Sequence, residues 1–482
     1  MTSCFFLHYP WTPHLETELE LIQDEIDRGN KVLILRCAGA LSSCSYNMNH
    51  SKLKCLNCKS RIDRALALLD STSYEEIYLE DVPKNSHPSK VFQTVNELMQ
   101  YTYKGDYNVG KFVASTLVSH LRDHGFSPKN YTKLISRQIA SSQSLIDQFN
   151  EFCQQRKIDK VVLFNGRFST PYSILSVCQK RNIEFFTHER GGQLDKYLLI
   201  HNNTPHSRAY AKNEIQSIWD ASTDEKRFTI GKAFFEDRRN KVIQGWVSFT
   251  KQQEENFLAP EIKEAKKLGK IIITIYTSSI DEFYAFDEWR GTNSLNQSSF
   301  LDELFSQLQN DSKYFFVVRM HPNLKGLKNL QNREMNQLIN KYSNSFLVTP
   351  EDKVDSYSLL DVSDMVVCFG STIGAEATYW GKVSVLIDHA FYQGLDIAYE
   401  VSSLCGLIQL IKSNKPIEPK KKENALKYGL WEYERGKHFK HTKVFGLFSA
   451  QFKGSSLDNN SFFSLAGKLR NKIRQRLKLI AG

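Results

Sequence analysis

The sequence predicts an α/β protein made of two Rossmann-like domains, each with a parallel sheet. The chain has 482 residues, and at roughly 150 residues per domain this length favours two or three domains. Hydrophobic residues make up 41% and charged residues 24%, a composition typical of globular chains with sizeable cores, which excludes a mainly disordered protein. Short β-rich runs alternate with stretches of helical period, and this alternation is typical of parallel sheets covered by helices.

The first series of strands predicts a domain over residues 1–245. We expect its strands at residues 4–9, 32–36, 76–80, 160–164 and 183–188. Stretches of helical period separate them, at residues 15–28, 111–124, 134–156 and 173–181.

A second series of strands predicts another domain over residues 269–455. We expect its strands at residues 270–276, 314–319, 346–349, 365–369 and 383–387. The charged segment 246–268, which is helical in period and poor in turns, is expected to be a helical linker between the two domains.

Residues 456–482 form a basic tail with the pattern of an amphipathic helix. Leu465, Leu469, Ile473 and Leu477 recur every four residues among many lysines and arginines. Such a helix suits an anionic membrane surface, and the alternative is that its apolar stripe packs on the protein itself. The N-terminus does not resemble a secretory signal, and no run approaches the length of a membrane span, so we expect a cytoplasmic protein held peripherally at the inner membrane.

The charge balance favours anionic partners. The chain has 63 Lys and Arg against 53 Asp and Glu, a net charge of +10, which suits nucleotides, phosphorylated sugars or an anionic membrane. Nucleic-acid binding is not expected, because the positive charge concentrates near the C-terminus without interleaved stacking aromatics.

Four of the nine cysteines lie within one short segment: Cys37, Cys44, Cys55 and Cys58. The odd number and low density argue against a disulfide framework. Two interpretations are open, a structural zinc site with four thiolate ligands and a group of free thiols. Redox catalysis is disfavoured because no thioredoxin-like context surrounds the Cys-x-x-Cys.

Polar residues follow three strands of the second series. Gly370, Ser371 and Thr372 lead from a strand into a helix, where a glycine allows a tight turn and hydroxyl and N–H groups favour a phosphate. His321 follows another strand beside Arg319, and this pair can stabilise a departing phosphate. Ser278 and Ser279, after a third strand, complete the predicted phosphate-binding set.

The order Arg-x-His-Pro from Arg319, Gly-Ser-Thr-x-x-x-Glu-Ala from Gly370 and then Gly381-Lys382 resembles the C-terminal donor domain of GT-B glycosyltransferases. It is similar to bacterial capsule and surface polysaccharide biosynthesis enzymes, including the Kdo-transferase and polysialyltransferase-like groups. The resemblance covers about residues 270–390. It implies that His321, Ser371 and Thr372 hold the donor phosphate and that Glu376 binds the nucleotide ribose.

In the N-terminal half, the segment His188-Glu189-Arg190-Gly191 resembles the acidic catalytic motif of this family. We expect Glu189 to be the general base that deprotonates the acceptor hydroxyl, a direct displacement that inverts the anomeric centre. Two alternatives stay open: Arg190 can make Glu189 a structural ion pair, and Asp195 is a competing base. The residues expected on the acceptor side are His8, Asn165, Arg167 and Asp195.

The resemblance therefore implies an inverting, metal-independent glycosyltransferase of surface glycan synthesis, of the hexosyl or Kdo/sialyl type. No Asp-x-Asp signature of a metal-dependent site is found, so no cofactor is expected for catalysis. The expected partners are a nucleotide-sugar donor, a glycan or glycolipid acceptor and an anionic membrane. The alternatives are a sugar-nucleotide epimerase of the same fold and a non-catalytic polysaccharide-assembly protein.

Overall fold

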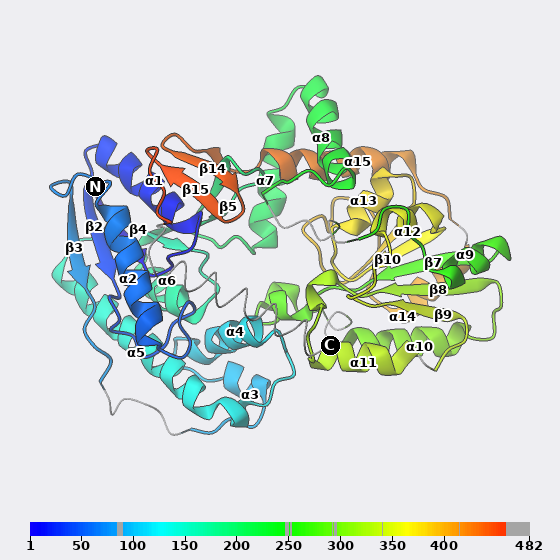
Figure 1. The fold of residues 1–482 in the computed structure, drawn as a ribbon, viewed down its shortest axis with the longest axis horizontal. Coiled ribbons are helices and arrows are strands. Elements are labelled where there is room, and N and C mark those ends of the chain that lie inside the picture. Colours follow the sequence, from blue (N-terminus) through cyan, green and yellow to red (C-terminus); the bar gives the residue numbers. More distant parts are fainter. Residues whose placement is uncertain are drawn as a thin grey trace, which may run out of the picture.

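The chain folds into two α/β domains that lie side by side (Figure 1). The computed structural model describes residues 1–83, 90–245, 250, 253–291, 293, 296–339, 341–413 and 415–458. The basic tail lies outside these residues from position 459 onwards, so its predicted amphipathic helix is not part of the fold described below.

The N-terminal domain is built on a seven-stranded sheet of order β13-β6-β5-β4-β1-β2-β3. Its parallel strands are β1 (Thr2–Leu7), β2 (Lys31–Arg36), β3 (Tyr74–Tyr78), β4 (Lys160–Phe164) and β5 (Glu184–Arg190). The antiparallel strands β6 (Lys196–His201) and β13 (Lys437–His438) extend one edge. The helices of this domain are α1 (His14–Asp27), α2 (Lys52–Leu66), α3 (Val95–Met99), α4 (Val109–Leu121), α5 (Thr132–Gln155) and α6 (Ser169–Arg181).

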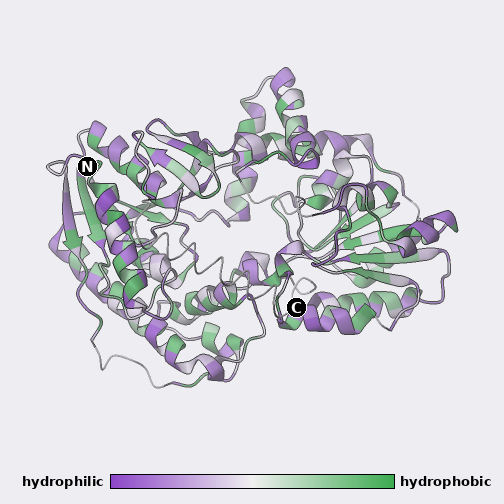
Figure 2. Ribbon diagram, viewed as in Figure 1, coloured by the Kyte–Doolittle hydropathy of each residue, from purple (hydrophilic) through white to green (hydrophobic). Residues whose placement is uncertain are grey.

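Both faces of this sheet are buried under helices. In β1, Cys4 and Phe6 pack into a core shared with α4, α5 and α6, whereas Phe5 and Leu7 pack into a core shared with α1 and α2. A strand that is covered on both sides needs apolar residues at successive positions. This is why β1 and β4 have apolar residues at successive positions. Figure 2 shows green strands next to helices whose outer faces are largely purple.

The C-terminal domain repeats this arrangement with a six-stranded parallel sheet of order β12-β11-β10-β7-β8-β9. Its strands are β7 (Ile271–Tyr276), β8 (Tyr314–Arg319), β9 (Ser345–Val348), β10 (Met365–Cys368), β11 (Val383–Ile387) and β12 (Tyr399–Val401). The helices that cover it are α9 (Pro260–Lys267), α10 (Gln297–Leu308), α11 (Leu330–Ile339), α12 (Ser356–Val362), α13 (Ile373–Tyr379) and α14 (Leu404–Ser413).

The strand orders confirm the predicted fold class of two Rossmann-like domains. In chain order the parallel strands run 3-2-1-4-5 in the first sheet and 3-2-1-4-5-6 in the second. In both sheets the order reverses between the first and fourth strands, β1 and β4 or β7 and β10. Ligands of such sheets bind at this reversal, beyond the carboxyl ends of the two strands.

Helices outside the sheets connect the two domains. They are α7 (Arg208–Asp220), α8 (Asp224–Arg239) and α15 (Pro419–Glu434). The long contact between α8 and α15 depends on two glycines. A Cβ atom on Gly231 would lie 2.6 Å from the carbonyl oxygen of Leu426, and one on Gly429 would lie 2.3 Å from the carbonyl oxygen of Gly231.

The structure corrects the predicted boundaries of the second domain and of the linker. After α15 the chain returns to the N-terminal domain, where β13 pairs with β6 and the hairpin of β14 (Thr442–Gly446) and β15 (Ser449–Phe452) packs on α1. The physical reason is that β6 offers a free antiparallel edge and Glu20 of α1 accepts the backbone N–H groups of Lys440 and His441. In the expected linker 246–268, the described helix is α9 alone, and the longer helix α8 precedes it.

Candidate functional site

Glu189 lies at the carboxyl end of the N-terminal sheet, where the residue that follows β4 forms a hydrogen bond with its carboxylate. The pairing of Phe164 with His188 brings Asn165 beside Glu189. The side-chain amide of Asn165 donates a hydrogen bond of 2.6 Å to Glu189 Oε2, and the backbone N–H of Arg190 donates one of 3.0 Å to Oε1. Asn165 has a positive φ of 61°, which asparagine tolerates better than most residues. The predicted base is therefore held in one orientation, and it is 6% exposed.

Two buried imidazoles and a second carboxylate surround Glu189. His14 Nε2 lies 3.6 Å from Glu189 Oε1, and His188 Nε2 lies 3.3 Å from Glu18 Oε1. Burial, aided by the charge of Arg190, holds the pKa of His14 well below its ordinary value. Burial and the neighbouring His14 lower the pKa of His188 to about 3, while burial and Glu16 raise that of Glu18. The imidazoles are thus neutral at pH 7 and can act as hydrogen-bond donors and acceptors beside the carboxylate.

Neither open alternative to Glu189 is favoured by the geometry. The Arg190 guanidinium donates to the carbonyl oxygens of Leu447 (2.7 Å) and Thr12 (3.4 Å), so only its backbone N–H reaches Glu189. Asp195 is exposed in the turn between β5 and β6, where its carboxylate pairs with His438 at 2.8 Å. Asp195 therefore lies in the turn that leads from β5 to β6, whereas Asn165 binds Glu189.

Aromatic side chains lead from this carboxylate to the surface. The ring of Tyr9 stacks on Phe164 at 4.4 Å and lies 5.9 Å from the His14 ring. Trp11 and Tyr46 flank Tyr9, with ring centroids 5.6 Å and 6.4 Å away. Trp11 is 50% exposed. We call Tyr9, Trp11 and Tyr46 the aromatic row.

The structure places His8 differently from its expected acceptor-side position. Its side chain is 2% exposed, stacks on Phe6 at 4.5 Å and donates from Nδ1 to the carbonyl oxygen of Phe6 at 3.2 Å. The reason is strand alternation: His8 continues the face of β1 that carries Phe6 into the core, and Tyr9 takes the opposite side.

In the C-terminal domain, polar residues follow β7, β8 and β10 as predicted. The Thr277 hydroxyl accepts the backbone N–H of His321 at 3.1 Å, which joins the ends of β7 and β8. His321 Nδ1 accepts the backbone N–H of Asn323 at 3.2 Å, so the proton of the neutral ring lies on Nε2. Burial lowers the pKa of His321 to about 4. The ring is therefore a neutral donor through Nε2.

Several predicted donor residues are tied into this end of the sheet by hydrogen bonds. Ser278 exchanges hydrogen bonds with Gln297, including Gln297 Nε2 to Ser278 Oγ at 2.8 Å. The Ser279 hydroxyl donates to Asp281. Arg319 is 2% exposed and donates to the carbonyl oxygen of Thr349 at 3.1 Å, so it braces the end of β9.

Gly370, Ser371 and Thr372 form the predicted turn at the start of α13. Gly370 has φ 86°, and a Cβ atom there would lie 2.4 Å from the carbonyl oxygen of His389, so only glycine fits. The backbone N–H of Ile373 donates to Ser371 Oγ at 3.4 Å. Ser371 and Thr372 thus follow the strand at the reversal point of the C-terminal sheet.

Glu376 lies at the centre of a buried network. Tyr357 donates its hydroxyl to Oε2 at 2.6 Å, Arg238 donates from Nε to Oε1 at 3.1 Å, and Thr372 donates to Oε1 at 3.3 Å. Burial alone would lower the pKa of Arg238, but Glu376 raises it above the ordinary value. Glu376 is 2% exposed and ties α13 to α8 and α12. Its role in ribose binding stays a prediction.

Hydrogen bonds join the two sets of strand ends across the domains. Arg167, after β4, donates to the carbonyl oxygen of Glu282, after β7, at 2.9 Å. Arg122 of the N-terminal domain pairs with Asp281 at 2.5 Å and donates to Asn323 at 3.2 Å. The carboxyl ends of the two sheets therefore face each other, with Arg167 between them.

A second link runs through His206, in the segment after β6. His206 Nε2 lies 3.3 Å from Asn165 Oδ1, and its carbonyl oxygen accepts the indole N–H of Trp289 at 2.7 Å. The sequence did not single out Arg122, His206 or Arg238, because none follows a strand that the sequence predicted.

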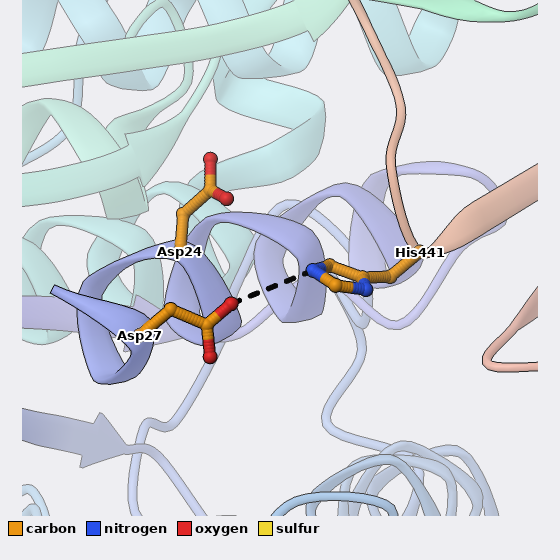
Figure 3. Close-up of side chains that lie close together, drawn as sticks. All are labelled: Asp24, Asp27 and His441. Carbon is orange, nitrogen blue, oxygen red and sulfur yellow. Dashed lines mark ion pairs between the residues drawn. The ribbon is translucent and has the colours of Figure 1, made fainter.

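Three candidate metal ligands lie close together among the described residues. The group whose ligand atoms all lie within 4.8 Å consists of Asp24, Asp27 and His441 (Figure 3). Lys440 Nζ lies 2.8 Å from Asp24 Oδ1, and Arg28 lies 3.9 Å from the same carboxylate. Both cations pair with Asp24, and Asp27 lies 3.7 Å from His441, so the group is best described as an ion-pair network between α1 and the segment before β14.

Comparison with known proteins gives similarities of structure only. No family model and no curated protein matches the chain. The chain is similar to KpsC, beta Kdo 2,4 transferase, of Thermosulfurimonas dismutans at 13% identity over 56% of this chain and 79% of that one, with a TM-score of 0.36. It is similar to UDP-GlcNAc 2-epimerase of Neisseria meningitidis bound to UDP-GlcNAc at 13% identity over 90% and 97% of the two chains, with a TM-score of 0.30. A glycotransferase of kitacinnamycin is similar at 13% identity over 89% and 94%, with a TM-score of 0.26.

Over the described part of the chain, no helix has the length and apolar character needed to cross a membrane.

Proposed function

We propose that the protein is an inverting glycosyltransferase that moves a sugar from a nucleotide-activated donor to a growing surface glycan. One observation carries the proposal: a buried, oriented carboxylate lies at the carboxyl end of one sheet, and hydroxyl and imidazole groups lie at the facing carboxyl end of the other sheet. A transferase needs a base for its acceptor and donors for a departing phosphate on opposite sides of one sugar.

In this proposal Glu189 takes the proton from an acceptor hydroxyl as that oxygen attacks the anomeric carbon. The bond from this carbon to the donor phosphate breaks, and its electron pair leaves with the phosphate oxygen. His321 Nε2–H and the Ser371 hydroxyl donate hydrogen bonds to the phosphate as its charge increases, and the Thr372 hydroxyl joins them once it turns away from Glu376. Asn165 and His14 hold Glu189 in place, which preserves the geometry that proton removal requires.

The aromatic row supports a glycan acceptor. Sugar rings have apolar faces that pack on aromatic side chains, and Trp11 presents such a face at 50% exposure. Tyr9 continues the row inward to Phe164, next to His14. We propose that acceptor sugars lie along this row, with the reactive hydroxyl at Glu189, and that the basic tail holds the enzyme at an anionic membrane.

A sugar-nucleotide epimerase is the second candidate. The observation that favours it is the pairing of carboxylates with imidazoles, Glu189 with His14 and Glu18 with His188, which offers acid and base groups without any acceptor. An epimerase changes its nucleotide sugar in the absence of an acceptor. A transferase consumes its donor in proportion to the glycan that it extends.

The experiment has two steps. First, thermal unfolding of the full chain is followed with UDP, GDP, CDP, CMP and dTDP, because a ligand of the folded state raises its stability. We expect one nucleotide to stabilise the protein, an effect lost in His321→Ala and kept in His201→Ala, which alters an exposed histidine of β6. Sugars carried by that nucleotide are then incubated with and without glycan acceptors.

Acceptor-dependent release of nucleotide with extension of the glycan supports the transferase. Conversion of the sugar without acceptor supports the epimerase instead. Nucleotide binding without turnover of any donor contradicts both enzymes and favours the non-catalytic assembly protein.

A further inference from the structure

The four clustered cysteines line one small cavity between β1, β2 and α2. The cavity has a volume of about 30 Å³, and Cys37, Cys44, Cys55 and Cys58 all border it. They come from separate elements: Cys37 directly follows β2, Cys44 lies in the next loop, and the other two lie in the first turns of α2. Convergence of all four thiols on one cavity is an arrangement that their spacing in the sequence alone does not guarantee.

Backbone N–H groups surround the two loop sulfurs. The N–H groups of Gly39 and Leu41 lie near the sulfur of Cys37, and that of Ala40 donates to the Cys37 carbonyl oxygen at 2.9 Å. The chain can fold back in this way because Ala38 and Gly39 both have positive φ, 48° and 101°.

The sulfur of Cys44 is surrounded in the same way. It accepts the backbone N–H of Asn47 at 3.2 Å and that of Tyr46. Burial raises the pKa of the Cys44 thiol to about 12 and that of Cys37 above its ordinary value, and the N–H groups oppose this rise without cancelling it. Such N–H contacts orient metal-bound ligands from outside the coordination sphere.

The two helix cysteines face the same cavity because they are spaced three residues apart. Residues at i and i+3 lie on one face of a helix, so Cys55 and Cys58 are neighbours. The side chain of Asn47 donates from Nδ2 to the Cys55 sulfur at 3.1 Å, which joins this helix to the Cys44 turn. The Cβ position of Gly39 lies 3.9 Å from Cys55 Cβ, which brings the Cys37 turn against the same residue.

The lining of the cavity is mostly apolar, but a buried histidine and a lysine also border it. His8 borders it, and because Nδ1 donates to Phe6, the neutral ring carries its lone pair on Nε2. Nε2 has no hydrogen-bond partner in the described structure, which favours a polar occupant of the cavity. Lys59 also borders the cavity, and Lys52 and Lys54 lie on the same helix, so positive charge is available for an anionic site.

We propose that this cavity binds one zinc ion through the thiolates of Cys37, Cys44, Cys55 and Cys58. Binding releases the four thiol protons and gives a site of net charge −2, which the lysines of α2 balance. No three of the four sulfurs lie within 4.8 Å of one another. The proposal therefore requires the four side chains to change rotamer on binding, so that each sulfur comes to about 2.3 Å from the ion.

The site has a structural purpose that does not depend on the proposed activity. It closes the segment from Cys37 to α2 into a fixed loop, and this loop carries Tyr46. The zinc ion thereby holds one ring of the aromatic row against Tyr9 and Trp11.

The test is a measurement of metal on the full chain, purified without chelators and without a metal-binding tag. We expect elemental analysis to find one zinc per chain, released by a thiol-modifying mercurial. Cys44→Ser and Cys58→Ser lose this zinc, whereas Cys405→Ser, which changes an exposed cysteine of α14, keeps it. If the cluster variants do not fold, the unmodified chain decides the question, since Co²⁺ exchanged for zinc gives the charge-transfer and d–d bands of tetrahedral thiolate cobalt.

Three results would overturn the proposal. One is a chain without zinc in which all four thiols react with a disulfide reagent at the same rate before and after addition of a chelator. Another is a bound metal that is lost in Asp27→Asn but kept in Cys58→Ser, which would assign the ion to the Asp24, Asp27 and His441 group. The third is a cobalt spectrum without thiolate charge transfer.

Discussion

The ion pair between Arg238 and Glu376 links α8 to α13. The loss in free energy of unfolding when this pair is broken can be estimated from the burial of its two side chains. Glu376 is 2% exposed, and the Arg238 side chain is 34% exposed. Breaking a fully buried pair costs about 3–5 kcal/mol, whereas an exposed pair contributes about 0.2–1 kcal/mol. With one partner buried and the other one-third exposed, we expect Arg238→Met to lower the free energy of unfolding by about 2–3 kcal/mol.

The assay is a double-mutant cycle measured by urea unfolding. Glu376→Gln alone keeps an acceptor for Tyr357 but leaves the guanidinium without its carboxylate. In the double variant neither charge is left unpaired, so its loss of stability is smaller than the sum of the single losses by about 1–2 kcal/mol. Lys232→Met, which breaks the exposed pair with Glu236 on the same helix, is the matched control and should cost at most about 0.5 kcal/mol.

The outcome that refutes this reasoning is additivity. If Arg238→Met costs no more than the Lys232→Met control and the cycle shows no coupling, then Glu376 does not depend on α8. The account of how the donor-side turn is braced would then be wrong.

Three further predictions concern the N-terminal domain. Asn165→Ala should lower kcat by about 10²-fold without weakening nucleotide binding, because Glu189 loses the amide that orients it, and steady-state kinetics with unchanged kcat would contradict this. Trp11→Ala should raise the KM for the acceptor while leaving the thermal shift by nucleotide unaltered; an unchanged KM removes the aromatic row from the acceptor site. Burial lowers the pKa of His8 from 6.5 to about 4, so as pH falls through this window the unfolded state takes up a proton that the folded state does not, and stability drops. At pH 5 this loss is about 2 kcal/mol relative to pH 7, and His8→Asn should remove it in urea titrations at the two pH values; identical pH profiles for both proteins would refute it.

The sequence predicted the strands well because strands covered on both faces leave an unambiguous pattern. All strands expected from the sequence are present, and β4, β8 and β11 begin and end where they were expected. The antiparallel strand β6 and the C-terminal strands β12–β15 were missed. The strands β12–β15 have two to five residues each, too few for a clear apolar run. The strand β6 has six residues and is mostly buried, so its length does not explain why it was missed.

The candidate site was predictable wherever a residue directly follows a strand. Asn165, His321 and Ser371 lie at strand ends, as the rule for parallel sheets requires. Arg238 could not be found in this way, because it reaches Glu376 from a helix far away in the sequence. The side of the sheet on which His8 lies was not predicted, because the sequence does not show where β1 ends and the chain turns.

Substitution of Glu189 tests the central claim most directly. Glu189→Gln keeps the size of the side chain and an oxygen for Asn165, but it removes the base. We expect nucleotide binding to be retained and transfer to the acceptor to fall by about 10²–10⁴-fold, whereas Asp195→Asn should leave transfer within about twofold, since Asp195 pairs with His438 at the surface. Transfer by Glu189→Gln at the rate of the unmodified enzyme, with loss in Asp195→Asn, would contradict the account.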